Sequence, residues 1–82
     1  MLKEEVWFQG ERVVKYSLAY INPRIFGADN GRILGYDNTH GQHHRHYRGH
    51  TEPTQFSSYQ ALVSRFEAEV RELWRCEDEE EN

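Results

Sequence analysis

The sequence predicts a small α+β domain, in which a four-stranded antiparallel β-meander is followed by one C-terminal amphipathic α-helix packed on one face of the sheet. Three observations lead to this prediction. Short β-rich apolar segments fill the first half of the chain, residues with turn propensity separate them, and one apolar stripe at helical spacing follows. The 82 residues have the length of a single domain, which we place at residues 1–76, with a disordered acidic tail at residues 77–82.

The first two strands are predicted to form a hairpin. Residues 6–8 are apolar, Gln9-Gly10 is suited to a tight turn, and residues 12–21 alternate with the period of two that is typical of a strand. Pro23 lacks a backbone N–H, so the second strand should end or bulge there. One face of this strand is expected to carry Val14, Tyr16, Leu18 and Tyr20.

Two more strands are predicted beyond this hairpin. Asn30-Gly31 is a strong hairpin signal because both residues tolerate positive φ, and residues 32–37 should form the third strand. Residues 37–41 are rich in Asp, Asn and Gly and should form another turn. Residues 42–48 would then be the fourth strand, and residues 49–56 a loop that leads to the helix.

The helix has the clearest pattern in the chain. Ser57 and Gln60 have the spacing of a capping box, and the helical period continues to about Arg75. Trp7 is expected to join the helix in the core. The apolar stripe of the helix should pack on the sheet through Tyr59, Leu62, Val63, Phe66, Val70, Leu73 and Trp74.

Composition and charge limit the classes of protein that fit. The formal net charge is −4, but five consecutive acids occupy residues 77–81, so residues 1–76 are close to neutral. Such a run is typical of a solvated tail. With Cys76 as the one cysteine, an intrachain disulfide and a Cys-rich zinc module are excluded. The sequence has no apolar run of signal-peptide or membrane-spanning length, so we expect a cytoplasmic protein that is not membrane-bound. Because so small a core is marginal, a homodimer or a partner chain is also expected.

All five histidines lie within residues 40–50, together with two arginines and one tyrosine and no acidic residue. Histidine has an ordinary pKa of about 6.5, so it can accept a proton, donate one or ligate a metal near neutral pH. Alternate residues of a strand share a face. One face should therefore present His44, His46 and Arg48, and the other His43, Arg45 and Tyr47.

This cluster is compatible with three functional interpretations and one structural one. The first is metal-free general acid–base cleavage of a phosphodiester, with an arginine offsetting charge on the phosphate. The second is a divalent metal site, for example for zinc, built from His40, His44 and His46 with Asp37. The third is nucleic-acid binding without turnover, by charge and stacking. The fourth is a polar surface strand without a chemical role.

The catalytic interpretation assigns a role to each candidate residue. Two imidazoles would act as the base and the acid, and Asp37 in the preceding turn would orient one of them by accepting its second N–H. The candidate catalytic residues are His40, His43, His44, His46, Asp37 and Arg48. The candidate substrate-binding residues are Arg45, Tyr47 and Asn38.

These motifs resemble those of a known family. The segment Gly-Arg-Ile-Leu-Gly-Tyr-Asp-Asn-Thr-His, followed by His-His-Arg-His-Tyr, then Phe-Ser-Ser-Tyr and a terminal helix, is similar to the TumE-type toxins of type II toxin–antitoxin pairs. The resemblance covers roughly residues 12–75 and marks Asp37, Asn38, His40, His43, His44 and His46. It implies growth inhibition by a ribonuclease or another RNA-directed activity, and a partner antitoxin with a DNA-binding helix-turn-helix.

Overall fold

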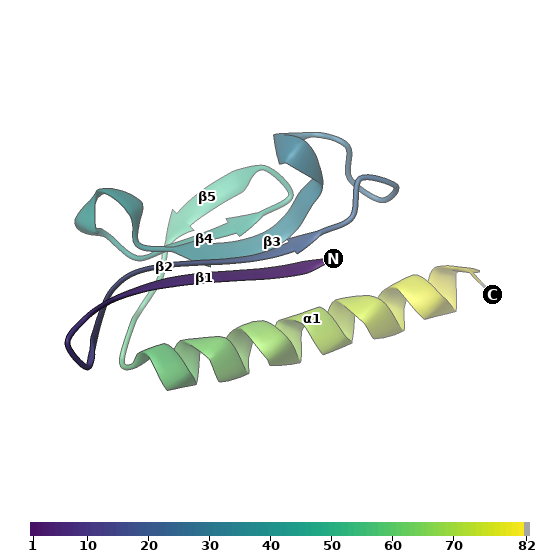
Figure 1. Cartoon of the computed structure of the whole chain (residues 1–82). Helices are drawn as coiled ribbons and strands as arrows, with labels where there is room; N and C mark the ends of the chain where they lie inside the picture. Colours follow the sequence, from purple (N-terminus) through teal and green to yellow (C-terminus); the bar gives the residue numbers. More distant parts are fainter. Residues whose placement is uncertain (82) are drawn as a thin grey trace.

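The computed structural model of the chain describes residues 1–81, and its description of side chains leaves out those of His40 and of residues 79–81. Within this part the chain forms one antiparallel sheet in the order β1-β2-β3-β4-β5 and a C-terminal helix α1 that lies along one sheet face (Figure 1). The predicted α+β class, with a meander and a helix on one face, is therefore confirmed. The elements are β1 (Leu2–Gln9), β2 (Arg12–Ile21), β3 (Arg32–Asp37), β4 (His44–Tyr47), β5 (His50–Pro53) and α1 (Tyr59–Glu81).

The strands at residues 12–21 and 32–37 have the bounds that the sequence predicted, whereas the outer strands differ. The first strand is longer than residues 6–8, because its whole length pairs with β2. The tight turn lies one residue later than predicted. It consists of Gly10 and Glu11. Gly10 has a positive φ (63°), which residues with a side chain rarely adopt.

The prediction of four strands is wrong by one. The expected fourth strand ends early at Tyr47, and residues 50–53 return as a fifth strand instead of a loop. Arg48 and Gly49 form the two-residue turn between them, with φ values of 47° and 83°. The pattern did not indicate this turn because an arginine rarely adopts positive φ. It did not indicate β5 because this edge strand is exposed along its whole length.

The Asn30-Gly31 signal marks the right conformation but the wrong kind of connection. Both residues have positive φ, at 56° and 80°. They lie, however, in a 3-10 turn at the end of a longer loop, residues 22–31, and not in a two-residue hairpin. This loop joins two strands that still pair directly with each other, as β2 and β3 do.

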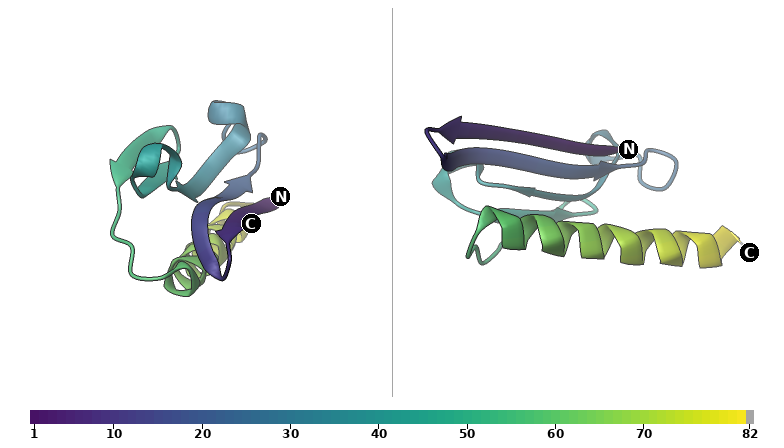
Figure 2. Two further views of the ribbon diagram at one scale, coloured as in Figure 1. Left: turned by 60° about the vertical axis from the view of Figure 1, so that its left-hand side comes forward. Right: turned by 60° about the horizontal axis from the view of Figure 1, so that its bottom comes forward.

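The core lies between the sheet and α1. Figure 2 shows from two further directions how α1 lies against the sheet. Tyrosines and aliphatic side chains of β2 and β3 pack there against the middle of the helix. Its buried members are Tyr16, Leu18, Tyr20, Ile33, Leu34, Tyr36, Leu62, Phe66 and Val70. The predicted helical stripe is thus confirmed at its centre. Three of its members are only partly buried: Tyr59, Val63 and Leu73.

Three apolar residues are exposed, among them the two tryptophans that were expected in the core. Trp7 and Trp74 are each 43% exposed, and Trp74 only meets the edge of the Tyr20 ring. Val14 is 44% exposed because it is the extra residue of a β-bulge, where the register between β1 and β2 shifts. The bulge reverses the alternation, and Val13 packs against the core in its place.

Both ends of the helix differ from the prediction. The hydroxyl oxygen of Ser58, not of Ser57, accepts a hydrogen bond from the N–H of Ala61 (3.1 Å), so the expected capping box with Gln60 is replaced by a single cap. At the other end α1 passes Arg75 and continues to Glu81 through the acidic run. The hydroxyl of Tyr20 donates to the carboxylate of Glu77 (2.8 and 2.9 Å), which attaches this extension to the sheet. The structure thus continues the helix through residues 77–81, where a disordered tail was expected, and Asn82 of that expected tail lies outside the described residues.

Replacing Phe66 with alanine tests the core. Phe66 is 5% exposed, and its ring meets the Tyr36 ring edge to face. Phe66→Ala should lower the free energy of unfolding by about 3–5 kcal/mol, through lost burial and an unfilled cavity. Denaturant unfolding measures the change, and Ser64→Ala, on the exposed side of the same helix, is the matched control. Equal stability of the two variants would contradict this description of the core.

Candidate functional site

Three of the candidate catalytic residues, Asp37, His44 and His46, lie on the sheet face turned away from α1. Directly opposed residues of an antiparallel pair share a face, and Asp37 opposes His44 while Gly35 opposes His46. His46 also opposes Thr51 on β5. The structure therefore brings together one carboxylate, two imidazoles and one hydroxyl from three neighbouring strands. The expectation that His44 and His46 share a face is confirmed.

His46 is held at both ring nitrogens. Its Nε2–H donates to Asp37 Oδ2 at 2.8 Å, and its Nδ1 lies 3.1 Å from the Thr51 hydroxyl. Because the carboxylate can only accept, neutral His46 carries its proton on Nε2, and Nδ1 then accepts the hydrogen of Thr51. The side chains of His46 and Asp37 are 15% and 13% exposed, so the pair is largely shielded from solvent but a ligand can still contact it. The result is a hydrogen-bonded series of carboxylate, imidazole and hydroxyl.

His44 stands next to this series with its ring free. The centroids of the His44 and His46 rings are 6.4 Å apart, and in the described part of the chain no hydrogen bond restrains the His44 ring. Two imidazoles at this separation can contact the same small group. One ring is restrained by hydrogen bonds and the other is available to a ligand.

Arg32 supplies a positive charge to this face. Its Nη1 lies 3.9 Å from Asp37 Oδ2, while Nε and Nη2 both lie 2.9 Å from Asp29 Oδ2. Gly35 leaves the space that the Arg32 side chain occupies, since a Cβ on Gly35 would be 2.8 Å from Arg32 Cδ. A glycine opposite His46 thus allows the guanidinium to lie across the strand.

Asn38, predicted to bind substrate, is instead used by the fold. Its Oδ1 accepts from the N–H of Tyr16 (3.0 Å), and its Nδ2 donates to the carbonyl of Val14 (3.1 Å). The side-chain amide thereby extends the ladder between β2 and β3 beyond the end of β3, at the bulge. The two hydrogen bonds of Asn38 also restrain the preceding residue, Asp37. In addition, Asp37 Oδ1 accepts a hydrogen bond from the N–H of Thr39 (3.2 Å).

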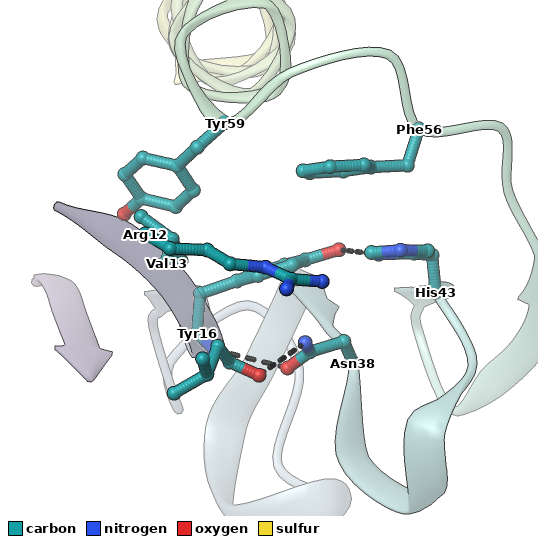
Figure 3. A pocket seen from close by; sticks show the side chains of 8 residues that line it. Arg12, Val13, Tyr16, Asn38, His43, Phe56 and Tyr59 are labelled. Carbon is teal, nitrogen blue, oxygen red and sulfur yellow. Dashed lines mark hydrogen bonds between the residues drawn. The ribbon is translucent and has the colours of Figure 1, made fainter. Parts of the chain in front are cut away.

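His43 lies apart from the other histidines, on the helix side of the sheet. Its Nδ1 is 2.8 Å from the hydroxyl of Tyr16, which we assign as the donor. The Phe56 ring stacks on His43, with centroids 4.1 Å apart and planes 3° from parallel. These three rings border a cavity of about 470 Å³ at the end of the sheet, together with Arg12, Val13, Val14, Asn38 and Tyr59 (Figure 3).

Arg45, the second predicted substrate-binding residue, is engaged by carboxylates. Its guanidinium donates to Glu69 on α1 (2.5 Å) and to Glu52 on β5 (3.2 Å). Hydrogen bonding to Glu69 raises the pKa of Arg45 above its ordinary value. The hydroxyl of Tyr36 donates to the same Glu69 carboxylate and also accepts from Arg45. This network joins the sheet to the helix.

Three remaining candidates lie outside the His44–His46 pair. Arg48 was expected beside this pair, but its positive φ ends the alternation of side chains along β4. Its guanidinium lies 5.8 Å from the Tyr47 ring centroid. Tyr47 packs against the core, and the guanidinium of Arg45 also lies 5.2 Å from its ring centroid. The backbone of His40 is in the 3-10 turn Thr39–Gly41, and its side chain falls outside the description.

The metal interpretation finds no supporting arrangement in the described residues. Among them, no three His, Cys, Asp or Glu side chains are grouped so that they could hold a metal ion. Asp37 and His46 are within hydrogen-bonding distance of each other, but the ring centroid of His44 lies 6.4 Å from that of His46. The metal site predicted from His40, His44, His46 and Asp37 stays a prediction, because the side chain of His40 lies outside the described part of the structure.

Comparison with known proteins covers most of the chain. The sequence model of the family described as Toxin TumE matches residues 2–74. The chain belongs to the TumE toxin family. As a TumE-family protein it is the toxin component of a toxin–antitoxin system, and its partner is an antitoxin. No curated protein and no solved structure matches the chain significantly. In the part that the structure describes, no helix has both the length and the apolar character needed to cross a membrane.

Several residues near the two candidate sites of this TumE-family protein were not predicted from the sequence. Thr51 was assigned to a loop, and Arg32 belongs to a strand whose bulge at Ile33 breaks the alternation. Tyr16 was predicted only to share a strand face with Leu18 and Tyr20, and nothing local pairs it with His43, 27 positions away. Phe56 carried no signal, because it lies in the loop before α1.

The raised pKa values of two buried tyrosines predict how the free energy of unfolding depends on alkaline pH. Burial is the largest of the effects that raise the pKa values of Tyr16 and Tyr36 from 10 to about 12. Between these values the unfolded chain loses protons that the folded chain retains, so the free energy of unfolding should fall as pH rises from 10 to 12. Urea unfolding at several pH values measures this fall. Tyr36→Phe removes one such group and should make the fall shallower, and an unchanged slope would contradict the assignment.

Proposed function

We propose that this TumE-family toxin is a metal-independent endoribonuclease, in which His44 and His46 act as a general acid–base pair on an RNA phosphodiester. One observation carries the proposal: His46 is held by Asp37 beside the free ring of His44, on the sheet face that α1 leaves uncovered. Two histidines with different restraints suit a reaction that needs one base and one acid.

His46 is the better candidate for the base. Asp37 accepts the Nε2–H, so it orients the ring and stabilises the imidazolium that forms when Nδ1 takes a proton. In the structure the Thr51 hydroxyl occupies Nδ1. A ribose 2′-hydroxyl can replace it there with the same donor geometry.

His44 is then the acid. His46 Nδ1 removes the proton of the 2′-hydroxyl, and the 2′-oxygen forms a bond to phosphorus. The bond from phosphorus to the 5′-oxygen breaks, and protonated His44 gives that oxygen a proton. The products are a 2′,3′-cyclic phosphate and a 5′-hydroxyl, so atoms and charge balance without a redox partner or a metal.

The charge that develops on the phosphate oxygens requires a cation. Arg48 remains a candidate because it is exposed at the turn after β4 and can bind a neighbouring phosphate. Arg32 lies on the same face as the histidines and is the nearer cation to Asp37. Arg45 is a weaker candidate, since Glu69 and Glu52 already hold its guanidinium.

The remaining proposals rest on the family resemblance and on exposed surface. We propose an antitoxin that carries a DNA-binding helix-turn-helix, and a cytoplasmic site of action on RNA. A homodimer is compatible with the apolar side chains of β1, since Leu2, Trp7 and Phe8 are 49%, 43% and 62% exposed. Size-exclusion chromatography with light scattering, on the toxin alone and with its antitoxin, tests the assembly.

The catalytic proposal predicts a matched set of variants. His44→Ala and His46→Ala should each slow cleavage of a short RNA by about 10²–10⁴-fold, because each removes one proton-transfer group. His50→Ala is the control, since His50 is exposed and opposes Tyr47 on the other face. The measurement uses toxin freed of its antitoxin, at about pH 5 to 9, with and without chelator.

The expected rate profile is bell-shaped and unaffected by the chelator. A rate that rises to a plateau with pH and is lost in chelator would support a metal-bound hydroxide instead. Full activity in the His44→Ala/His46→Ala double variant would exclude the catalytic role of the pair. No cleavage of RNA by the wild-type protein would leave a binding module as the better interpretation.

A second candidate mechanism follows from the series Asp37, His46 and Thr51. A carboxylate, an imidazole and a hydroxyl in hydrogen-bond contact is also the arrangement of a nucleophilic hydroxyl with its base. The Thr51 oxygen would then bond to phosphorus while His46 takes its proton, the bond from phosphorus to the 5′-oxygen would break with a proton from His44, and the 3′-fragment of the cleaved site would leave as a 5′-hydroxyl from a covalent intermediate on Thr51.

Thr51→Val separates the two mechanisms. Valine keeps the shape of threonine but lacks the hydroxyl, so acid–base cleavage by His44 and His46 should stay within the same order of magnitude as wild type. A nucleophilic Thr51 predicts complete loss of turnover, with an adduct on Thr51 detectable by mass spectrometry in the wild type. The melting temperature of the variant is the control for folding.

A further inference from the structure

We propose that the cavity at the end of the sheet, between Tyr16, His43, Phe56 and Arg12, is a subsite for one unpaired nucleobase of a single-stranded RNA. The proposal rests on the proposed ribonuclease function, because it assigns the cavity to a nucleotide next to the one that is cleaved. It adds a second binding region, on the opposite side of the sheet from the His44–His46 pair.

The walls of the cavity suit a flat aromatic ligand. His43 and Phe56 are 3° from parallel, and Tyr16 lies 14° from Phe56 and 16° from His43. Figure 3 shows the Phe56 ring above the plane of Tyr16 and His43, with the Tyr59 ring at the other side of the opening. A base that enters in this common orientation stacks on rings already aligned with it, as in single-strand binding proteins. The volume, about 470 Å³, lies within the range of small-ligand pockets.

The polar groups of the cavity suit a nucleotide better than an apolar ligand. Figure 3 places the Arg12 guanidinium across the opening, and no carboxylate in the described part of the chain pairs with it. A free guanidinium is suited to a phosphate oxygen. Since the Tyr16 hydroxyl donates to His43 Nδ1, the neutral His43 ring carries its proton on Nε2, which remains able to donate to a base edge. The amide of Asn38 is held by the backbone of β2 through one of its N–H groups and its oxygen.

The loop that carries Phe56 is held in place without the ligand. The N–H of Thr54 donates to the carbonyl of His43 (3.0 Å), and the Arg65 guanidinium donates to the carbonyl of Gln55 (3.2 Å). Phe56 itself is 37% exposed and contributes no hydrogen bond to this arrangement. A stacking ring is therefore presented on a fixed loop, at low conformational cost for binding.

The two regions are close along the sheet. Asp37 and Asn38 are consecutive, as are His43 and His44, and in each pair one residue faces the catalytic side while the other borders the cavity. Consecutive Cα atoms are about 3.8 Å apart. An RNA strand that passes around this end of the sheet can place one phosphate at the histidine pair and a neighbouring base in the cavity.

The test measures binding without cleavage. The probe is a mixed-sequence single strand of about ten nucleotides made of 2′-O-methyl RNA, which lacks the attacking hydroxyl, and a matched strand in which every base is absent. Wild-type protein should bind the strand with bases about ten- to hundred-fold more tightly than the abasic strand. Phe56→Ala should remove most of this difference, and Phe56→Tyr should restore it.

Two further variants complete the design. Arg12→Ala should weaken both strands alike and reduce the salt dependence of binding by about one phosphate contact. Phe8→Ala is the control, because Phe8 is a 62% exposed ring on β1 outside the cavity. Melting temperatures establish that each variant is folded.

The outcomes separate the subsite from the catalytic proposal. If wild-type protein binds both strands equally, or if folded Phe56→Ala keeps the full preference for bases, the subsite is wrong, whatever the cleavage assay gives. If the preference depends on Phe56 but natural RNA is not cleaved, the subsite stands and the ribonuclease proposal fails. Loss of preference in Phe8→Ala instead would place the base on the β1 surface and overturn the assignment.

Discussion

The side-chain amide of Asn38 links the end of β3 to β2, and both candidate sites depend on this link. It accepts from the backbone of Tyr16 and donates to that of Val14, at the point where a bulge has shifted the register of β2. The preceding residue, Asp37, is thereby fixed beside the histidines of β4. Tyr16 is fixed on the other face, where its hydroxyl reaches His43. The Asn38 side chain thus replaces backbone hydrogen bonds between β3 and β2, and it positions residues on both faces of the sheet.

The histidines of this short segment do not form one centre. The period of two in β4 directs His44 and His46 to the open face, and the residue before the strand, His43, to the cavity under the loop of Phe56. Their partners also differ in kind. A carboxylate orients His46, while a phenol and an aromatic ring hold His43. The first arrangement suits proton transfer, and the second suits stacking.

Much of the charge near these sites serves the fold. Arg45 is bound by carboxylates from the helix and from β5, and Tyr36 joins the same network. These contacts hold α1 against a sheet whose buried part is small, and Tyr20 and Glu77 do the same near the end of the helix. Near the two candidate sites, Arg12 at the cavity and Arg48 at the β4–β5 turn are then available to a polyanionic ligand, whereas Arg32 on the open face is already paired with Asp29.

The sequence by itself determined the fold class, the bounds of β2 and β3, the central stripe of the helix and the shared face of His44 and His46. Each of these follows from a local period, because every residue of a regular strand or helix takes its direction from its own position. The tertiary structure alone decided the features that break a period. A bulge exposed Val14, a positive φ turned Arg48 away and created β5 with Thr51, and another bulge with a glycine gap allowed Arg32 to approach Asp37. It also decided the long-range pairs, Arg45 with Glu69 and Tyr16 with His43, because such contacts depend on where distant segments meet and leave no pattern in the neighbouring residues.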